Sequence, residues 1–370
     1  MTATARRLAA PVGRPLARAL VRARTRRWPP WSRLLALGDG GGWSVDEDAA
    51  HVAAAARRLG YETAPGRWAR FVDRQAVFVT SHFEALAPRW LETSHRLGTA
   101  YLHGRPGTPG APEFDLAFEA LRQEPRRLER IQVTHQEMHE LVLEAGVPEE
   151  RVFRIPIGID LERFPLGGRE EREQSRRRLG LPQEAFVVGS FQKDGVGWAE
   201  GLEPKLVKGP DVLVRALGLL RAEVPELHVL LTGPARGYVR RELERLGVPY
   251  VHVELETRSG LAAAYHALDL YLVASRQEGG PKAVLEAMAT GTPLVSTRVG
   301  QAQELVRDGE NGWLVEVEDA EALAACALHV RDGVEERVLA AGRATAEAHA
   351  HERLDALWAE LLKGFVCHAR

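Results

Sequence analysis

The chain has 370 residues, a formal net charge of −2, 45% hydrophobic and 27% charged residues, and two cysteines, Cys326 and Cys367. This length favours two domains. The small net charge argues against nucleic-acid binding, two cysteines are too few for a disulfide framework or a four-cysteine zinc site, and no apolar run is long enough to cross a membrane. These features predict a reduced, cytoplasmic protein.

Residues 1–28 differ from the rest, because they contain eight arginines and no acidic residue. They lack the long apolar core of a secretory signal. Apolar residues repeat every four positions and arginines lie on another face, which is typical of a basic helix that lies on an anionic membrane. Pro11 and Pro15 interrupt such a helix and favour a flexible tail instead. Both interpretations stay open, and the first adds peripheral membrane contact.

Residues 29–165 are expected to form an N-terminal α/β domain. The run "RLLALGD" predicts a strand that leads into Gly40, Gly41 and Gly42, and residues 49–60 predict a helix that ends in glycine. The later strand candidates are "QAVFVTSH", "GTAYLHG", "RIQVTH" and "VFRIPIG". Residues 166–182 are polar, charged and glycine-containing, and we expect them to link the two domains.

Residues 183–335 alternate short apolar runs with amphipathic stretches, starting at "AFVVGSF" and ending at "AEALAACALHV". Such alternation predicts a parallel sheet that is covered by helices on both faces. Ligands of these sheets bind beyond the carboxyl ends of the strands, where Gly233 and residues 275–280 are expected. The last segment, 336–370, is predicted to be helical.

The stretch "SRQEGGPKAVLEAMATGTPLV", residues 275–295, contains Glu278 and Glu286 eight positions apart. A glycine-rich turn separates the first glutamate from a predicted helix, whose start can hold an anion. Eight residues are about two helical turns, so the two carboxylates can contact distant parts of one extended ligand. Lys205 and Lys208 precede another predicted helix and could reach a phosphate, although such a lysine is usually only solvated.

From about residue 186 to 317 the sequence resembles the nucleotide-sugar-binding domain of retaining glycosyltransferases, and in particular glycosyltransferase family 4. The resemblance rests on "GVPEERVFRIPIGIDLERFP", "KGPDVLVRAL", "LHVLLTG" and the long block "ALDLYLVASRQEGGPKAVLEAMATGTPLVSTRVGQAQELVRDGENGWLV". It implies an α/β protein with two facing Rossmann-like domains (the GT-B fold) and an interdomain cleft. It also implies that the last segment returns to the N-terminal domain.

The resemblance further implies roles for the residues of this block. Glu286 would bind the ribose hydroxyls of the nucleotide, and Glu278 would lie near the transferred sugar. The backbone amides from Gly280 to Ala283 would face the diphosphate and the sugar, and the donor-binding turn and helix start comprise Gly279, Gly280, Pro281, Lys282 and Ala283. His103, in "AYLHGRPG", would lie near the reacting centre, and Gly41 and Gly42 would approach the donor phosphate and the acceptor.

Lys208 matches the family lysine that neutralises the diphosphate leaving group. The family usually places an arginine a few residues earlier, but residues 190–207 contain none. We therefore expect Lys193 or Lys205 to take its place. No metal site is expected, since lysines and backbone amides stabilise the leaving group and no Asp-x-Asp run is present.

Two other patterns do not lead to a function. His135 and His139 have the spacing of two zinc ligands on one helix face, but no third ligand is evident, and a solvated helix is expected. Ser81 and His82 follow a predicted strand without the Gly-x-Ser-x-Gly turn of a hydrolase.

The resulting hypothesis is a metal-independent hexosyltransferase-type enzyme that moves a sugar from a nucleotide-diphosphate sugar to the hydroxyl of a sugar, lipid or small-molecule acceptor, with retention of configuration. It needs no further cofactor and binds no nucleic acid. Two alternatives stay open: a nucleotide-sugar epimerase of the same fold, and a nucleotide-sugar-binding protein without catalysis.

Overall fold

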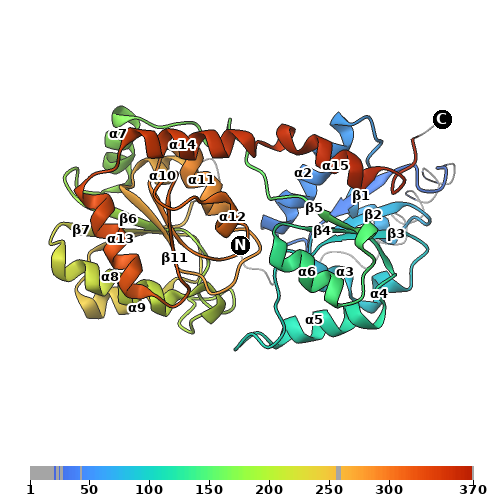
Figure 1. Ribbon diagram of the computed structural model, residues 1–370, viewed down its shortest axis with the longest axis horizontal. Coiled ribbons are helices and arrows are strands. Elements are labelled where there is room, and N and C mark those ends of the chain that lie inside the picture. Colours follow the sequence, from blue (N-terminus) through green and yellow to red (C-terminus); the bar gives the residue numbers. More distant parts are fainter. Residues whose placement is uncertain (1–20, 22–24, 26–27, 42–43, 256–259, 369–370) are drawn as a thin grey trace.

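The computed structural model describes residues 21, 25, 28–41, 44–255 and 260–368. Two α/β bodies lie side by side, each built around one parallel sheet (Figure 1). The predictions made for the basic segment 1–28 fall almost entirely outside the described residues.

The first body contains a five-stranded parallel sheet in the order β1-β2-β3-β4-β5. Its middle strands are buried because helices cover both faces, as continuous apolar runs require. The strands are β1 (Leu34–Leu37), β2 (Ala76–Val79), β3 (Arg96–Ala100), β4 (Leu128–Val133) and β5 (Val152–Arg154). The helices are α2 (Ser44–Arg58), α3 (His82–Ala85), α4 (Pro88–Leu91), α5 (Pro112–Gln123) and α6 (Gln136–Glu144).

Helix α2 begins at Ser44 and not near Ala49, where the apolar pattern predicted it. Its first turn contains Asp46 and Glu47, and acidic side chains stabilise the positive end of a helix. The earlier start brings the first turn of α2 to the interface with the second body.

The second body contains a six-stranded parallel sheet in the order β11-β10-β9-β6-β7-β8. All strands are parallel, but the order in which they are added reverses at β6: β7 and β8 follow on one side of β6, and β9, β10 and β11 on the other. The loops after β6 and β9 therefore diverge. The strands are β6 (Phe186–Ser190), β7 (Leu227–Thr232), β8 (Tyr250–Val253), β9 (Leu270–Val273), β10 (Leu294–Thr297) and β11 (Trp313–Val315). In α/β sheets, ligands bind at such a reversal point.

The helices of the second body are α8 (Pro210–Glu223), α9 (Gly237–Leu246), α10 (Leu261–His266), α11 (Lys282–Thr290), α12 (Ala302–Leu305) and α13 (Ala320–Asp332). The segment expected to link the domains also contains a helix, α7 (Arg169–Leu179), which packs on α10. Arg176 of α7 is fully buried and donates to the carbonyl oxygens of Ala267 and Ala185. This part of the segment therefore belongs to the second body.

The C-terminal segment crosses from one body to the other (Figure 1). Helix α14 (Glu336–Ala348) packs on α11, and a short 3-10 turn, His351–Leu354, leads to α15 (Asp355–Leu362) on the first body. Trp358 of α15 packs edge-on against Phe78 of β2, with 5.9 Å between ring centroids. The last helix thus completes the core of the N-terminal half.

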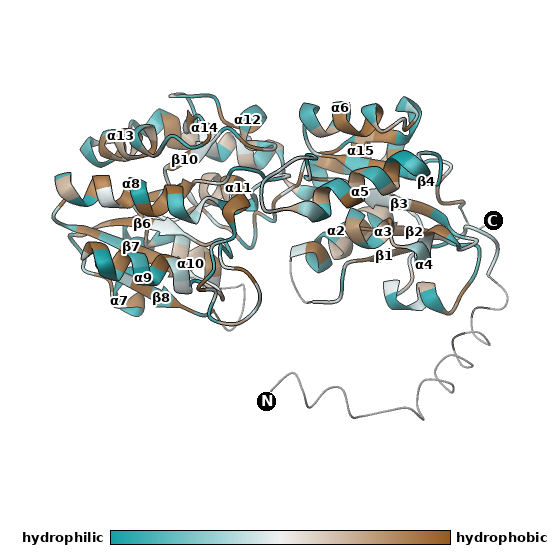
Figure 2. Ribbon diagram, turned by 90° about the horizontal axis from the view of Figure 1, so that it is seen from below, coloured by the Kyte–Doolittle hydropathy of each residue, from teal (hydrophilic) through white to brown (hydrophobic). Residues whose placement is uncertain are grey.

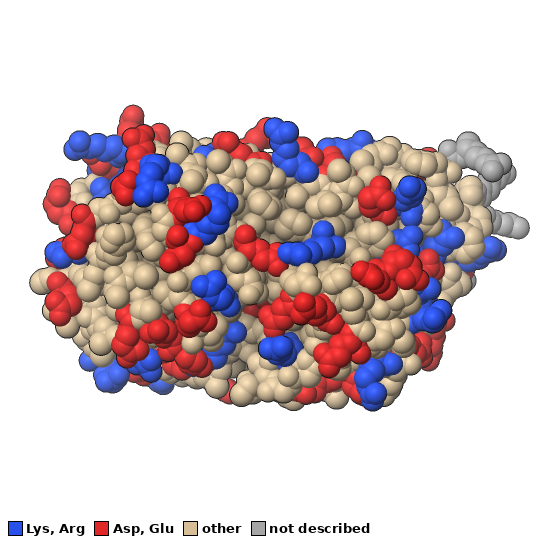
Figure 3. Space-filling view, viewed as in Figure 1, with Lys and Arg blue, Asp and Glu red and all other residues tan. Residues whose placement is uncertain are grey.

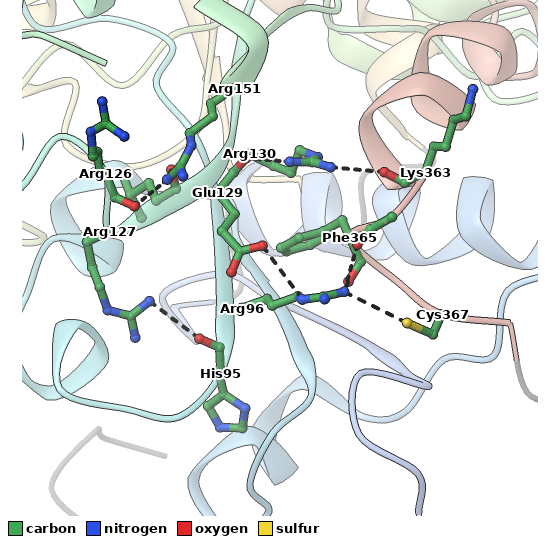
Figure 4. A network of polar contacts seen from close by, with 12 residues as sticks. His95, Arg96, Arg126, Arg127, Glu129, Arg130, Arg151, Lys363, Phe365 and Cys367 are labelled. Carbon is green, nitrogen blue, oxygen red and sulfur yellow. Dashed lines mark hydrogen bonds and ion pairs between the residues drawn. The ribbon is translucent and has the colours of Figure 1, made fainter. Parts of the chain in front are cut away.

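Two arginines hold the end of the chain on the first sheet (Figure 4). Arg96 of β3 donates to the carbonyl oxygen of Gly364 at 2.7 Å, and Arg130 of β4 donates to those of Leu361 and Lys363, both at 2.9 Å. Backbone carbonyls in the last turn of a helix and just after it need donors, and the two guanidinium groups supply them at the end of α15.

Apolar residues concentrate on the strands and on the inward faces of the helices (Figure 2). On the face shown in Figure 3, basic and acidic side chains are interspersed, in keeping with the small net charge. Within the described part of the chain, every helix is too short or too polar to pass through a lipid bilayer.

Candidate active site

The candidate site lies beyond the carboxyl ends of β6 and β9, where the second sheet reverses. The loop after β6 leads to Lys208, and the loop after β9 contains Ser275 and Glu278. Loops at the carboxyl ends of β3 and β4 meet them from the first body, because Thr134 donates to the carbonyl oxygen of Gly279 at 2.5 Å. The predicted donor turn is therefore part of the contact between the two bodies.

Glu278 is the centre of a hydrogen-bonded group. Its Oε1 lies 2.5 Å from Nζ of Lys208 and accepts a 3.0 Å hydrogen bond from the hydroxyl of Ser275. Gln192 contacts both loops, since it donates to the carbonyl oxygen of Lys208 at 2.7 Å and accepts from the hydroxyl of Ser275 at 3.1 Å. Burial would raise the pKa of Glu278, but the Lys208 ammonium outweighs it and the pKa is lowered, so the carboxylate stays ionised.

His103 follows β3 and faces this pair from the first body. Phe83 and Phe114 lie edge-on to its ring, with centroids 5.9 and 5.5 Å away. Burial, together with the nearby ammonium of Lys208, lowers the pKa of His103 to about 4. His103 is therefore a neutral imidazole at physiological pH, which can exchange hydrogen bonds with a sugar without adding charge.

Lys193 and Lys205 lie close to Lys208. Burial and the neighbouring Lys208 ammonium lower the pKa of Lys205, and burial also lowers the pKa of Lys193. Nζ of Lys193 donates to the carbonyl oxygen of Gly195 and lies 4.4 Å from the ring centroid of Trp198. Ammonium groups that are crowded in this way are ready to neutralise a multiply charged anion.

Close packing explains the glycines of the predicted donor turn. A Cβ on Gly279 would lie 2.4 Å from Cβ of Leu102, which follows β3 in the first body. A Cβ on Gly280 would lie 2.6 Å from the side-chain carbon of Gln301. Pro281 caps α11, and Ala283 lies in its first turn. The turn can approach the first body only because it lacks side chains.

Glu286 lies about one turn into α11 and accepts a 2.8 Å hydrogen bond from the hydroxyl of Tyr265 on α10. Tyr265 is fully buried and packs against Phe191, with 4.9 Å between ring centroids. The phenol fixes one carboxylate oxygen and thereby orients the other. Sequence reasoning missed Tyr265, although its place in "AAAYHAL" gives the periodicity of a helix face.

The side chain of Lys282 contacts the first body, whereas the resemblance implied a donor contact through its backbone amide. Its Nζ lies 2.6 Å from Oδ1 of Asp48 and 3.2 Å from the carbonyl oxygen of Ser44, both on α2. The ammonium group is thus committed to the first body, and the structure leaves only the backbone amide of Lys282 for the predicted donor contact.

Two of the predicted ligand glycines, Gly41 and Gly233, lie in described loops outside the donor turn. The amide of Gly41 donates to Asp39 at 2.9 Å within the loop before α2, and Gly42 lies outside the described residues. Gly233, at the carboxyl end of β7, has a φ of +82°, and its carbonyl oxygen accepts from His252. These hydrogen bonds do not involve Lys208 or Glu278, and the ligand roles of Gly41 and Gly233 stay predictions.

A buried ion pair that the sequence did not predict anchors the long loop after β6. Nη2 of Arg236 lies 3.0 Å from Oδ2 of Asp194, and neither side chain is exposed. Arg236 also donates to the carbonyl oxygen of Ser190 at 2.6 Å. The guanidinium group of Arg236 therefore lies at the end of β6, near the position where the family arginine was expected. Through Asp194 it also fixes the loop that contains Lys193 and Lys205 to the sheet.

The histidine pair expected on a solvated helix is in part buried. His135 is only 1% exposed, precedes the first residue of α6 and bonds to the Thr134 hydroxyl at 2.9 Å, so the expectation was wrong for His135. His82 stacks on Tyr101, with 4.1 Å between ring centroids.

The described ranges contain no group of three or more His, Cys, Asp or Glu side chains that could hold a metal ion.

A pocket of about 440 Å³ lies behind the donor turn, between the two bodies. Gln301 lines it, and the amide of Gln301 donates to the carbonyl oxygen of Gly279 at 3.2 Å. Its other polar side chains include Thr134, Arg154, Glu304, Arg307 and His349.

Comparison with known proteins agrees with this geometry. Residues 194–332 match the family model described as Glycosyl transferases group 1. D-inositol 3-phosphate glycosyltransferase 1 of Catenulispora acidiphila is 35% identical over 247 residues, which are 62% of this chain and 55% of the relative. The corresponding enzyme of Geodermatophilus obscurus is 35% identical over 213 residues, 52% of this chain and 43% of the relative. The chain spans about half the length of these curated relatives.

Solved structures share the arrangement of both bodies. HepE of Anabaena, solved in complex with UDP-glucose, has a TM-score of 0.68 and 18% identity over 90% of this chain and 99% of its own. A glycosyltransferase from Rickettsia africae has a TM-score of 0.68 and 16% identity over 91% of this chain and 100% of its own. The chain therefore has the GT-B fold and contains a Glycosyl transferases group 1 domain, as the resemblance implied.

Proposed function

We propose that the protein is a retaining glycosyltransferase that moves a sugar from a nucleotide-diphosphate sugar to an acceptor hydroxyl. The observation that carries the proposal is the meeting of Lys208 and Glu278, 2.5 Å apart, with the neutral His103 of the facing body. It brings a cation for a leaving group, a carboxylate and an uncharged hydrogen-bonding ring to one place.

In the proposed reaction, the diphosphate departs from the anomeric carbon toward Lys208, with Lys193 and Lys205 adding positive charge. Stabilising the charge that develops on a leaving group is the largest electrostatic need of this chemistry. The acceptor hydroxyl attacks from the same face and gives its proton to the departing diphosphate. His103 and Glu278 hold the sugar while positive charge builds up at its ring oxygen.

The named relatives suggest which substrates to test first. HepE was solved with UDP-glucose, and the curated relatives are named for D-inositol 3-phosphate. We therefore propose a UDP-sugar donor and a phosphorylated polyol acceptor as the first pair. The epimerase alternative is not favoured, since the matching relatives are named as transferases.

Thermal unfolding with UDP-, GDP-, ADP- and TDP-sugars, measured beside Glu286→Ala, tests the donor site. A ligand that binds only the native state stabilises it by about 2.7 kcal/mol at a hundredfold excess over its dissociation constant. We expect one nucleotide to raise the melting temperature and the variant to lose this shift. No shift with any nucleotide would contradict the donor site, and binding without transfer to any acceptor would favour the inactive binding protein.

Peripheral membrane contact through residues 1–28 is a separate proposal, supported by their eight arginines. Co-sedimentation of the full chain with vesicles that contain anionic lipid tests it. We expect binding that weakens as salt rises, and equal binding to neutral vesicles would contradict it.

A further inference from the structure

The ion pair between Lys282 and Asp48 joins residues that are 234 positions apart in the chain. The two side chains are only 23% and 19% exposed, so solvent screens their attraction less than that of a surface pair. Lys282 also donates to the carbonyl oxygen of Ser44, so one ammonium group makes two contacts to α2.

The position of this pair relates it to the candidate site. Lys282 is the first residue of α11, directly after the turn of Gly279 and Gly280, and α11 also contains Glu286. Asp48 is in the first turns of α2, the helix that follows the glycine loop of the first body. The pair therefore connects the helix that starts at the donor turn with the helix that faces it.

Other contacts support the same closed arrangement. Nη1 of Arg163 lies 3.2 Å from Oε1 of Glu47, the neighbour of Asp48 on α2. On another side of the donor turn, Arg154 pairs with Glu304, whose Oε1 also accepts a 2.8 Å hydrogen bond from the amide of Gln136. The pair of Lys282 is the one among these polar contacts that starts on α11 itself.

We infer that Lys282 is a positioning residue that holds the two bodies closed over the donor, and that its ammonium group does not bind the diphosphate. This inference rests on the proposed function. The Lys282 ammonium group is held by Asp48 and Ser44 on α2, whereas Lys193 and Lys205 add positive charge beside Lys208 at the candidate site. Closure matters for transfer because it excludes water and brings the facing groups together.

The test compares Lys282→Met, Asp48→Ala and the double variant by UDP calorimetry and by transfer at saturating donor. UDP affinity should stay within about twofold, while kcat falls about tenfold in each single variant, the size of a typical allosteric or closure coupling. The double variant should be no slower than either single variant, since both remove the same contact. Lys282→Arg, which keeps the charge, should retain most of the activity.

Two results would overturn the inference. One is a loss of UDP affinity in Lys282→Met but not in Asp48→Ala, which would assign the ammonium group to the diphosphate. The other is a double variant whose loss equals the product of the single losses. The exposed pair Arg169–Glu173 on α7 provides the control, because its removal should leave both readouts unchanged.

A scattering experiment separates this inference from the proposed function. Small-angle X-ray scattering of the ligand-free full chain should give a larger radius of gyration for Lys282→Met than for the unaltered protein. An unchanged radius would contradict the closing role. If no acceptor ever supports transfer, the proposed function fails, and the scattering and UDP measurements still decide the role of Lys282.

Discussion

His103 contributes to the site as a neutral ring, because burial and Lys208 lower its pKa to about 4. We predict that His103→Ala leaves nucleotide affinity nearly unchanged and reduces transfer about a hundredfold, the size of losing one preorganised donor at a reacting centre. Calorimetry with UDP and initial rates measure the two effects. His139→Ala, on helix α6, is the matched control, and an equal loss of binding in His103→Ala would contradict the catalytic placement.

His351 should make the stability of the protein depend on pH. Its ring stacks on His51, with 3.7 Å between centroids. Burial, and then the neighbouring His51, Lys282 and Arg58, lower its pKa to about 3. A histidine whose pKa is lowered by folding contributes stability that is complete above the unfolded value of 6.5, and this stability is lost as pH falls toward the folded value.

We therefore expect the protein to lose about 2 kcal/mol of unfolding free energy through His351 between pH 7.5 and pH 5, from the linkage relation. Urea unfolding at both values measures the loss. His351→Gln should flatten this dependence, whereas His329→Gln, an exposed position on α13, should keep it. Parallel curves for His351→Gln and the unaltered protein would refute the assignment.

At the scale of elements, the donor turn fits against the first body because Gly279 has no side chain. A methyl group at this position would lie 2.4 Å from Cβ of Leu102. The carbonyl oxygen of Gly279 also accepts a hydrogen bond from Thr134, so the turn cannot move away freely. We predict that Gly279→Ala lowers transfer about a hundredfold, since a displacement of about 1 Å costs that much in a positioned site.

Gly218→Ala is the matched control for this prediction. Gly218 lies inside α8, where an added methyl group meets only the flexible end of Leu246 at 3.3 Å and where alanine favours the helix. It should leave transfer unchanged. Normal transfer in Gly279→Ala would show that the turn does not need this close approach.

The sequence predicted the kind and order of the elements well, because apolar runs and glycine stops are local signals. It located the strands of the first sheet and, in the second body, the strand within "AFVVGSF" and the helix within "AEALAACALHV". It did not predict α7, whose burial depends on Arg176 finding carbonyl oxygens near Ala267 and Ala185. A polar segment shows no apolar periodicity, so nothing local separates a docked helix from a linker.

At the scale of the whole molecule, α15 contributes a side chain that the N-terminal core needs. Trp358 is 8% exposed and packs on Phe78, whereas its neighbour Leu357 is 40% exposed. We predict that Trp358→Ala lowers the free energy of unfolding by about 3–5 kcal/mol, and Leu357→Ala by less than about 1 kcal/mol. Urea titration followed by circular dichroism compares them, and equal losses would contradict the packing argument.

The site itself could be predicted only in part. Glu278, Glu286 and Lys208 lie within recognisable local motifs, and the structure brings Glu278 and Lys208 together. The partners of Lys282 and Arg236 could not be predicted, because Asp48 and Asp194 are distant in sequence and neither pair leaves a local pattern. Which body a charged side chain faces depends on how the two sheets meet.

The return of the chain to its first body also determines the order in which the two bodies can complete their folding during synthesis. Ribosomes release the N-terminal half first, yet Trp358, Leu361 and Phe365 of its core are made only after the whole second body. The second body, whose core is completed by α14 at Ala346, can fold while the first still exposes an apolar face. A nascent chain that has not yet reached α15 would thus present an uncovered sheet, and cellular chaperones would meet the first body before this helix arrives.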